Sequence, residues 1–171
     1  MNALRPQTPG STPLRSATPA GGLPPGGQIR RLALSGTSGT VGRAREFARE
    51  ALQDWKWLPG ETEEQTAVAE DVLLLVSELV TNACLHAGGP TGLTLRGTAR
   101  SVRVEVSDAG DGTPVPRVPH VPGRPGGHGL HIVERLASAW GTARQDDGKT
   151  VWLEVPAPLT RSAPASQRVS Q

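Results

Sequence analysis

Residues 77–90 read "SELVTNACLHAGGP", and this stretch decides how the rest of the chain is interpreted. Glu78, Asn82 and His86 are four residues apart, so on a helix they form one polar stripe. Most of the residues around them are apolar, which predicts a helix that is buried over much of its surface. A buried carboxylate or amide needs a polar partner. The stripe therefore faces solvent, is satisfied within the core, or lines a cavity that holds a polar ligand.

The segments on either side predict one α/β domain. Helical periodicity and alternating strand patterns follow one another along the chain, separated by Gly and Pro. We predict helices over residues 39–60, 64–87 and 129–141, strands over 28–34, 92–99 and 101–108, and a final hairpin over 141–156. Helices and strands in this order predict a two-layer sandwich, in which a mostly antiparallel, mixed sheet is covered on one face by three helices.

Composition divides the chain into a folded part and two tails. The 171 residues suit one ordinary domain, which we place at residues 30–156. Residues 1–29 and 157–171 are rich in Pro, Gly, Ser and Thr, and we predict that both are disordered.

The net charge of +2 comes from the tails. The first 30 residues and the last 15 contain five Arg and no acidic residue, so the rest of the chain carries 2 − 5 = −3. A mildly acidic domain argues against a nucleic-acid-binding face.

The sequence also limits where the protein acts. No apolar run is long enough to span a membrane, and the N-terminus lacks the apolar core of a signal peptide. Cys84 is the only cysteine, which excludes an intrachain disulfide and a site built from several cysteines. These features predict a cytoplasmic protein with no membrane partner.

A second candidate site lies at the end of a predicted strand, in "SVRVEVSDAGDG", residues 101–112. Asp108 has the same parity as the strand valines, so its carboxylate should point towards the core. Gly110 and Gly112 follow and permit close approach to the backbone. A buried carboxylate there is a good acceptor for an amino group such as that of adenine. Taken alone, the pattern fits an Asp-Gly turn better than a binding site.

A third candidate site is "GGHGLHIV", residues 126–133, which leads into a predicted helix. Free backbone N–H groups and the helix dipole at such a start favour phosphate. Because the chain contains 21 Gly, a lone Gly-x-Gly also fits a plain helix entry. The Gly- and Pro-rich loop before it, about residues 109–126, is longer than a simple connection, which is typical of a lid or binding loop.

These three motifs, in this order, resemble the ATP-binding superfamily of gyrase, the heat-shock chaperone, histidine kinases and MutL (the GHKL superfamily). The wording "SELVTNACLHAG…SDAGDG…GGHGLHIVERLASAWG…GKTVWLEVP" is most similar to the small anti-sigma-factor serine/threonine kinases of actinobacteria (RsbW-like). The resemblance covers about residues 30–156 and implies a histidine-kinase-like ATPase fold. It also implies ATP and Mg²⁺ as cofactors.

The resemblance assigns roles to the polar side chains of two motifs. Asn82 matches the Asn that holds Mg²⁺ against the phosphates, so it is both a metal ligand and a nucleotide-binding residue. Glu78 matches the catalytic base. Asp108 matches the Asp that accepts the adenine amino group. Thr150 resembles a Thr near the adenine, but its parity is opposite to that of the neighbouring apolar residues, so we exclude it.

The resemblance assigns the glycines to nucleotide binding. Gly110 and Gly112 would let the base pack against the backbone. Gly127, Gly129 and Leu130 would close the phosphate side at the start of the third helix, and the loop before them would be the ATP lid.

Two functions remain open at this point. The first is an anti-sigma factor with serine/threonine kinase activity. Its partners are a sigma factor and a STAS-type anti-anti-sigma protein, and a homodimer is one assembly open to it. The second is a non-phosphorylating module, in which ATP only orders the surface that sequesters a regulatory partner. Intact Glu78 and Asn82 favour the first.

Overall fold

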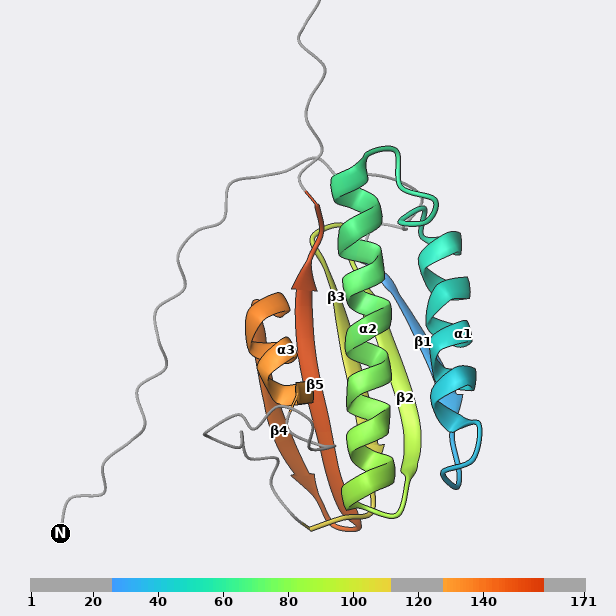
Figure 1. The fold of residues 1–171 in the computed structure, drawn as a ribbon, viewed down its shortest axis with the longest axis vertical. Coiled ribbons are helices and arrows are strands. Elements are labelled where there is room, and N and C mark those ends of the chain that lie inside the picture. Colours follow the sequence, from blue (N-terminus) through green and yellow to red (C-terminus); the bar gives the residue numbers. More distant parts are fainter. Residues whose placement is uncertain (1–25, 112–127, 159–171) are drawn as a thin grey trace, which may run out of the picture.

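The structure is a computed structural model that describes residues 26–111 and 128–158. Three helices lie on one face of a five-stranded sheet (Figure 1), as the sequence predicts. The strands are β1 (Gln28–Ala33), β2 (Pro90–Gly97), β3 (Ser101–Asp108), β4 (Ala139–Gln145) and β5 (Gly148–Pro156). The helices are α1 (Thr40–Asp54), α2 (Glu63–His86) and α3 (His128–Leu136).

The sheet has the strand order β1-β2-β3-β5-β4, and every pairing among the described strands is antiparallel. The prediction of a mostly antiparallel sheet is confirmed, but the sheet is not mixed. Short turns join β2 to β3 and β4 to β5, and such turns can connect only antiparallel neighbours. The centre of the sheet, where β3 pairs with β2 and β5, lies under α2 (Figure 1).

Helix α2 forms where the apolar periodicity predicts it, whereas α1 ends at Asp54, six residues before the predicted end at Gly60. Lys56 has a positive φ of 62°, which a continuing helix does not allow. The buried side of α1 consists of small residues and one Leu, which bring it close to α2. Helix α2 begins at Thr62, whose hydroxyl accepts a hydrogen bond from the Gln65 N–H at 3.2 Å. It ends at His86, before Gly88 and Gly89, which both have positive φ and turn the chain into β2.

The third helix is shorter than the sequence predicts, and this is a correction. It ends at Leu136, and Trp140 lies in β4 rather than on the helix. The Ser138 N–H donates to the Glu154 carbonyl at 2.9 Å, and this hydrogen bond starts the ladder with β5. Backbone pairing with β5 therefore takes precedence over the helical periodicity of "LASAW".

The described elements run from Gln28, at the start of β1, to Pro156, at the end of β5. Gln28 and Ile29 therefore belong to a strand and not to the predicted disordered tail at residues 1–29. The tails lie almost entirely outside the described residues, so their disorder stays a prediction. No helix in the described part of the chain is long and apolar enough to cross a membrane.

Candidate functional site

Asp108 is the last residue of β3, and the register of the sheet places it between Pro90 of β2 and Lys149 of β5. Its side chain is buried, and it follows the alternation that also buries Val102, Val104 and Val106. The predicted inward parity of this carboxylate is therefore confirmed. A carboxylate in this setting has left water and depends on the protein for its hydrogen bonds.

The carboxylate has two partners among the described residues, and both reach the same oxygen. The Gly110 N–H donates to Asp108 Oδ1 at 2.9 Å, which closes a tight turn at the end of the strand. The Lys149 ammonium donates to Oδ1 at 2.8 Å and lies 3.5 Å from the Gly110 carbonyl oxygen. Asp108 is thus held by one oxygen in a buried ion pair.

Lys149 is the residue that the sequence analysis missed. It is buried, at the first inward position of β5, and it has the same parity as Val151, Leu153 and Val155. This parity was visible in "GKTVWLEVP". A lysine at an inward strand position needs a partner, and the buried acid on the neighbouring strand supplies it.

Gly110 brings the end of α2 against the end of β3. A Cβ on Gly110 would lie 2.8 Å from the Ala87 Cβ and 3.0 Å from the Lys149 Nζ, so a larger residue would not fit. Ala87 follows directly after His86, the last residue of α2. The helix that carries Glu78 and Asn82 therefore ends beside the Asp108–Lys149 pair, which brings together the first two motifs.

Glu78 and Asn82 lie at the border between the buried and exposed sides of α2. Both are half-buried, while Leu74 and Leu85, on the outer side of the helix, are exposed. Within residues 26–111 and 128–158, neither Glu78 nor Asn82 has a hydrogen-bonding partner. The neighbouring Ser77, by contrast, donates to the Leu73 carbonyl at 2.9 Å. The side chains of Glu78 and Asn82 are thus neither hydrogen-bonded within the described core nor fully exposed to solvent.

The other sequence-predicted site residues divide into two groups. Gly129 and Leu130 lie in the first turn of α3, as predicted. Gly112, Gly127 and most of the predicted lid lie outside the described residues.

Thr150 lies outside the Asp108 site, in agreement with its parity. Its hydroxyl is 2.8 Å from that of Ser107 and accepts a hydrogen bond from Gln145. Ser107 and Thr150 alternate with Asp108 and Val151, so they lie on the sheet face away from the helices.

A match to a family model shows which family the chain belongs to. The model described as the histidine kinase-like ATPase domain matches residues 34–155. The chain belongs to this family. The resemblance seen in the sequence is confirmed at this level, and the chain is an ATP-binding domain of the histidine kinase-like type.

The fold of this histidine kinase-like domain also occurs in a solved structure. The crystal structure of the RsbU and RsbW domains of Rv1364c from Mycobacterium tuberculosis is 20% identical, with a TM-score of 0.51 over 80% of this chain and 35% of that chain. The histidine kinase domain of the Erythrobacter litoralis EL346 blue-light activated histidine kinase is 21% identical, with a TM-score of 0.40 over 74% of this chain and 66% of that chain. The chain thus spans about a third of the first structure. Curated proteins show no match.

A histidine kinase-like domain of this kind has few protein ligands to offer a metal. No cluster of three or more His, Cys, Asp or Glu residues occurs in the described part of the chain. Mg²⁺ commonly retains water and takes only one or two protein ligands beside the phosphates of its nucleotide. The half-buried Asn82 side-chain oxygen fits that role.

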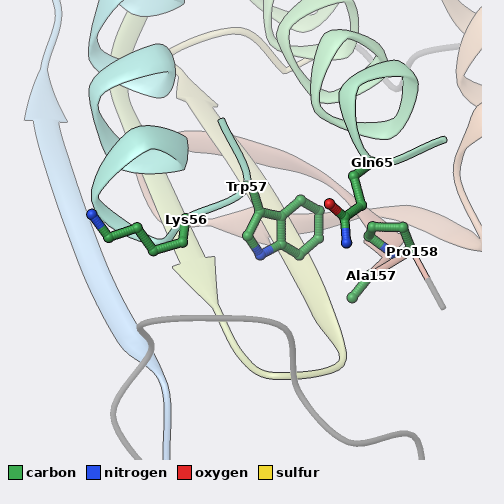
Figure 2. Close-up of a pocket in the computed structure, with 5 residues that line it drawn as sticks. All are labelled: Lys56, Trp57, Gln65, Ala157 and Pro158. Atoms are coloured by element: carbon green, nitrogen blue, oxygen red, sulfur yellow. The ribbon is translucent and has the colours of Figure 1, made fainter. Parts of the chain in front are cut away.

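Figure 2 shows a shallow pocket elsewhere on the domain. It is lined by Lys56, Trp57, Gln65, Ala157 and Pro158. Gln65 lies in the first turn of α2, about 30 Å along the helix from the end that adjoins Asp108. The Gln65 side chain already accepts a hydrogen bond from the Glu61 N–H at 2.6 Å. This pocket is therefore separate from the candidate nucleotide site.

Proposed function

We propose that this domain binds ATP with Mg²⁺ and transfers its γ-phosphoryl group to a serine or threonine of a protein partner. The observation that carries the proposal is the contact between the end of α2 and the end of β3 at Gly110. This contact places α2, whose Glu78 and Asn82 have no partner among the described residues, next to the buried carboxylate of Asp108, within a histidine kinase-like ATPase domain.

Each side chain has a role that suits its surroundings. Asp108 accepts a hydrogen bond from the amino group of adenine. A buried carboxylate favours a base with a donor over one without, because an unsatisfied buried acceptor costs free energy. Asn82 supplies an oxygen to Mg²⁺, and the bound ion would offset the negative charge of the phosphates. Gly110 and Gly112 allow the base to approach the backbone, while Gly127, Gly129 and Leu130 form the phosphate side at the start of α3.

Glu78 acts as the general base. The hydroxyl oxygen of the substrate forms a bond to the γ-phosphorus, the bond from that phosphorus to the ADP oxygen breaks, and the hydroxyl proton passes to the Glu78 carboxylate. A half-buried carboxylate without a partner among the described residues is available for this proton. Most of the rate acceleration then comes from positioning and from stabilisation of the transferred phosphoryl group.

The regulatory part of the proposal concerns the partners. We propose that the domain is a cytoplasmic anti-sigma factor whose substrate is a STAS-type anti-anti-sigma protein, with a homodimer as one possible assembly. Two observations support it: the motif sequences resemble those of RsbW-like kinases, and the fold is similar to a structure that includes an RsbW domain. The mildly acidic domain supports protein partners rather than nucleic acid or membrane.

Nucleotide binding is tested first by calorimetry of ATP with and without Mg²⁺. We expect Mg²⁺-dependent binding by the wild type and binding weakened by about tenfold or more in Asp108→Asn and Asn82→Ala. The control is Glu50→Ala, which changes an exposed residue of α1 and should bind ATP as the wild type does. A wild-type protein that binds no ATP at millimolar concentration would refute the proposal.

Phosphoryl transfer is tested separately with radiolabelled ATP and purified STAS-domain proteins from the same organism. Glu78→Ala should bind ATP within about twofold of the wild type but transfer phosphate about 100-fold more slowly. If the wild type never transfers phosphate, and ATP-dependent binding of a partner survives in Glu78→Ala, the kinase assignment is wrong. That result would favour the non-phosphorylating module.

A further inference from the structure

Lys149 is a buried charge to which the proposed function gives no role. The exposed fractions of the Lys149 and Asp108 side chains are 9% and 3%, which leaves almost no contact with water. The register of β3 and β5 places the two residues directly opposite each other. The next inward pair along the same two strands is Val106 with Val151, so apolar packing is the rule here.

Stability alone does not explain this ion pair. Removing two charges from water has a large desolvation cost, and replacing a buried ion pair by well-packed apolar residues is often neutral or stabilising. A second apolar pair at positions 108 and 149, like the pair of Val106 with Val151, would have avoided the desolvation cost. A charged pair at the rung nearest the proposed nucleotide site therefore indicates a role in that site.

The contacts show what the ammonium does to the carboxylate. Lys149 Nζ and the Gly110 N–H both bond Asp108 Oδ1, at 2.8 and 2.9 Å. The ammonium also faces the Gly110 carbonyl oxygen, so it links the carboxylate to the turn that follows β3. With Oδ1 held from two sides, the carboxylate cannot rotate freely, and Oδ2 keeps one orientation.

Gly148 seats the lysine in this position. Its φ is 146°, and a Cβ there would lie 2.8 Å from the Ala109 Cα and closer still to the Asp108 carbonyl oxygen. The β4–β5 turn can therefore pack directly against the end of β3. This close approach places the Lys149 side chain within hydrogen-bonding distance of Asp108.

We infer that Lys149 is a positioning residue for recognition of the nucleotide base. It holds Asp108 by Oδ1 and neutralises its charge, so that Oδ2 is the acceptor for the exocyclic amino group of adenine. This inference rests on the proposed function, because it assumes that Asp108 meets the base. On this inference, the domain prefers a base with an amino group because Lys149 positions Asp108.

Electrostatics explains why the ammonium matters when a base is bound. A base that donates to Asp108 removes the remaining water from the carboxylate. Without Lys149, Oδ1 keeps only the Gly110 N–H and the carboxylate is free to turn, so the gain from the amino group is largely lost. With Lys149 in place, the pair is already neutral as a unit, so the amino group adds a charge-assisted hydrogen bond.

The test compares two nucleotides that differ only in this amino group. Calorimetry with Mg²⁺ measures the dissociation constants of ATP and of purine riboside triphosphate, which lacks the 6-amino group. We expect the wild type to prefer ATP by about tenfold or more. Lys149→Met keeps the length of the side chain and removes the charge. In this variant the preference should fall below about twofold, while the analogue binds within about threefold of the wild type.

Two further variants separate positioning from packing. Lys149→Arg keeps the charge and the donors, so it should still prefer ATP over the analogue by about threefold or more. Lys56→Met makes the same change at an exposed lysine beside the pocket of Figure 2 and should leave the preference unchanged. If Lys149→Met does not fold, Lys149→Gln, whose side chain is shorter and uncharged, takes its place with the same expected loss.

Two results would overturn the inference while the proposed function stands. The first is a folded Lys149→Met or Lys149→Gln that keeps the wild-type preference for ATP. The second is an equal loss of affinity for both nucleotides, which would mean that the lysine only supports the structure. A wild type that binds neither nucleotide would refute the proposed function itself and the inference with it.

Discussion

At the level of single residues, the Asp108–Lys149 ion pair differs in burial from the ion pairs on the surface. In the pair between Arg30 and Asp54, the Asp54 side chain is 59% exposed, whereas the Asp108 side chain is 3% exposed. Solvent screens an exposed pair, and its contribution to stability is small. Removing one partner of a buried pair leaves an uncompensated charge in the core.

The first prediction concerns this contrast. Asp108→Asn should lower the free energy of unfolding by about 3 kcal/mol, because Lys149 then lacks a counter-charge. Asp54→Asn, the matched change in the exposed pair, should lower it by less than about 1 kcal/mol. Urea unfolding followed by tryptophan fluorescence measures both. Equal effects of the two substitutions would show that the Asp108 pair is not effectively buried.

The second prediction concerns the only thiol. Burial raises the pKa of the Cys84 thiol, so the folded protein holds less thiolate than an exposed cysteine at the same pH. Iodoacetamide should therefore modify Cys84 more slowly in the folded protein than in urea, and the rate should rise only at higher pH. Mass spectrometry against time gives both rates. Identical rates at pH 8, with and without urea, would contradict this expectation.

Residue types and parity in the sequence were enough to find Asp108, but Lys149 was missed. The alternation of apolar residues in β3 predicted the direction of the Asp108 side chain, and the structure confirms it. The same alternation runs through β5, yet a lysine at a strand start is usually solvated. Only the pairing of β3 with β5 shows that an acid lies opposite.

At the level of elements, local periodicity predicted the described helices and strands, and the main errors lay at the C-terminal ends of α1 and α3. Trp140 and its neighbours continue the helical pattern of α3, but they pair with β5. Gly141 permits this, because a Cβ there would lie 2.9 Å from the Trp152 ring. Hydrogen bonds to β5, the other strand of the hairpin, decided the boundary, and helical periodicity does not contain them.

The third prediction tests how closely the β4–β5 turn packs on β3. Gly148→Ala should destabilise the protein by about 2 kcal/mol, since φ is 146° and the new methyl group would meet the backbone of residues 108 and 109. Gly42→Ala is the control. This glycine is exposed within α1 with no atom near the added methyl group, so the change should stabilise by about 1 kcal/mol. Thermal unfolding measures both, and a neutral Gly148→Ala would argue against the close packing.

At the level of the whole molecule, the described core belongs to one domain. Every buried core residue lies between Leu34 and Val155, within the predicted limits of residues 30–156. Strand β1 pairs along its whole length with β2, although its side chains are mostly exposed. The domain should therefore need β1 but not the terminal residues outside it.

The fourth prediction follows from these limits. A chain of residues 26–158 should unfold within about 0.5 kcal/mol of the full-length protein, because it keeps the whole described core. A chain that starts at Ser35 also lacks β1 and its ladder with β2, and should lose more than about 2 kcal/mol. Urea unfolding of the three chains checks both expectations. A large loss in the 26–158 chain would show that a tail contributes to the fold.

The sequence by itself determined which segments form helices and strands, which family the chain resembles, and which way Asp108 points. These properties follow from local periodicity and residue type, which one segment carries alone. Only the tertiary structure decided that Lys149 faces Asp108, that Ala87 meets Gly110, and that Trp140 joins the sheet. The physical reason is that each of these contacts joins two different elements, so strand register and helix packing must form before the side chains meet.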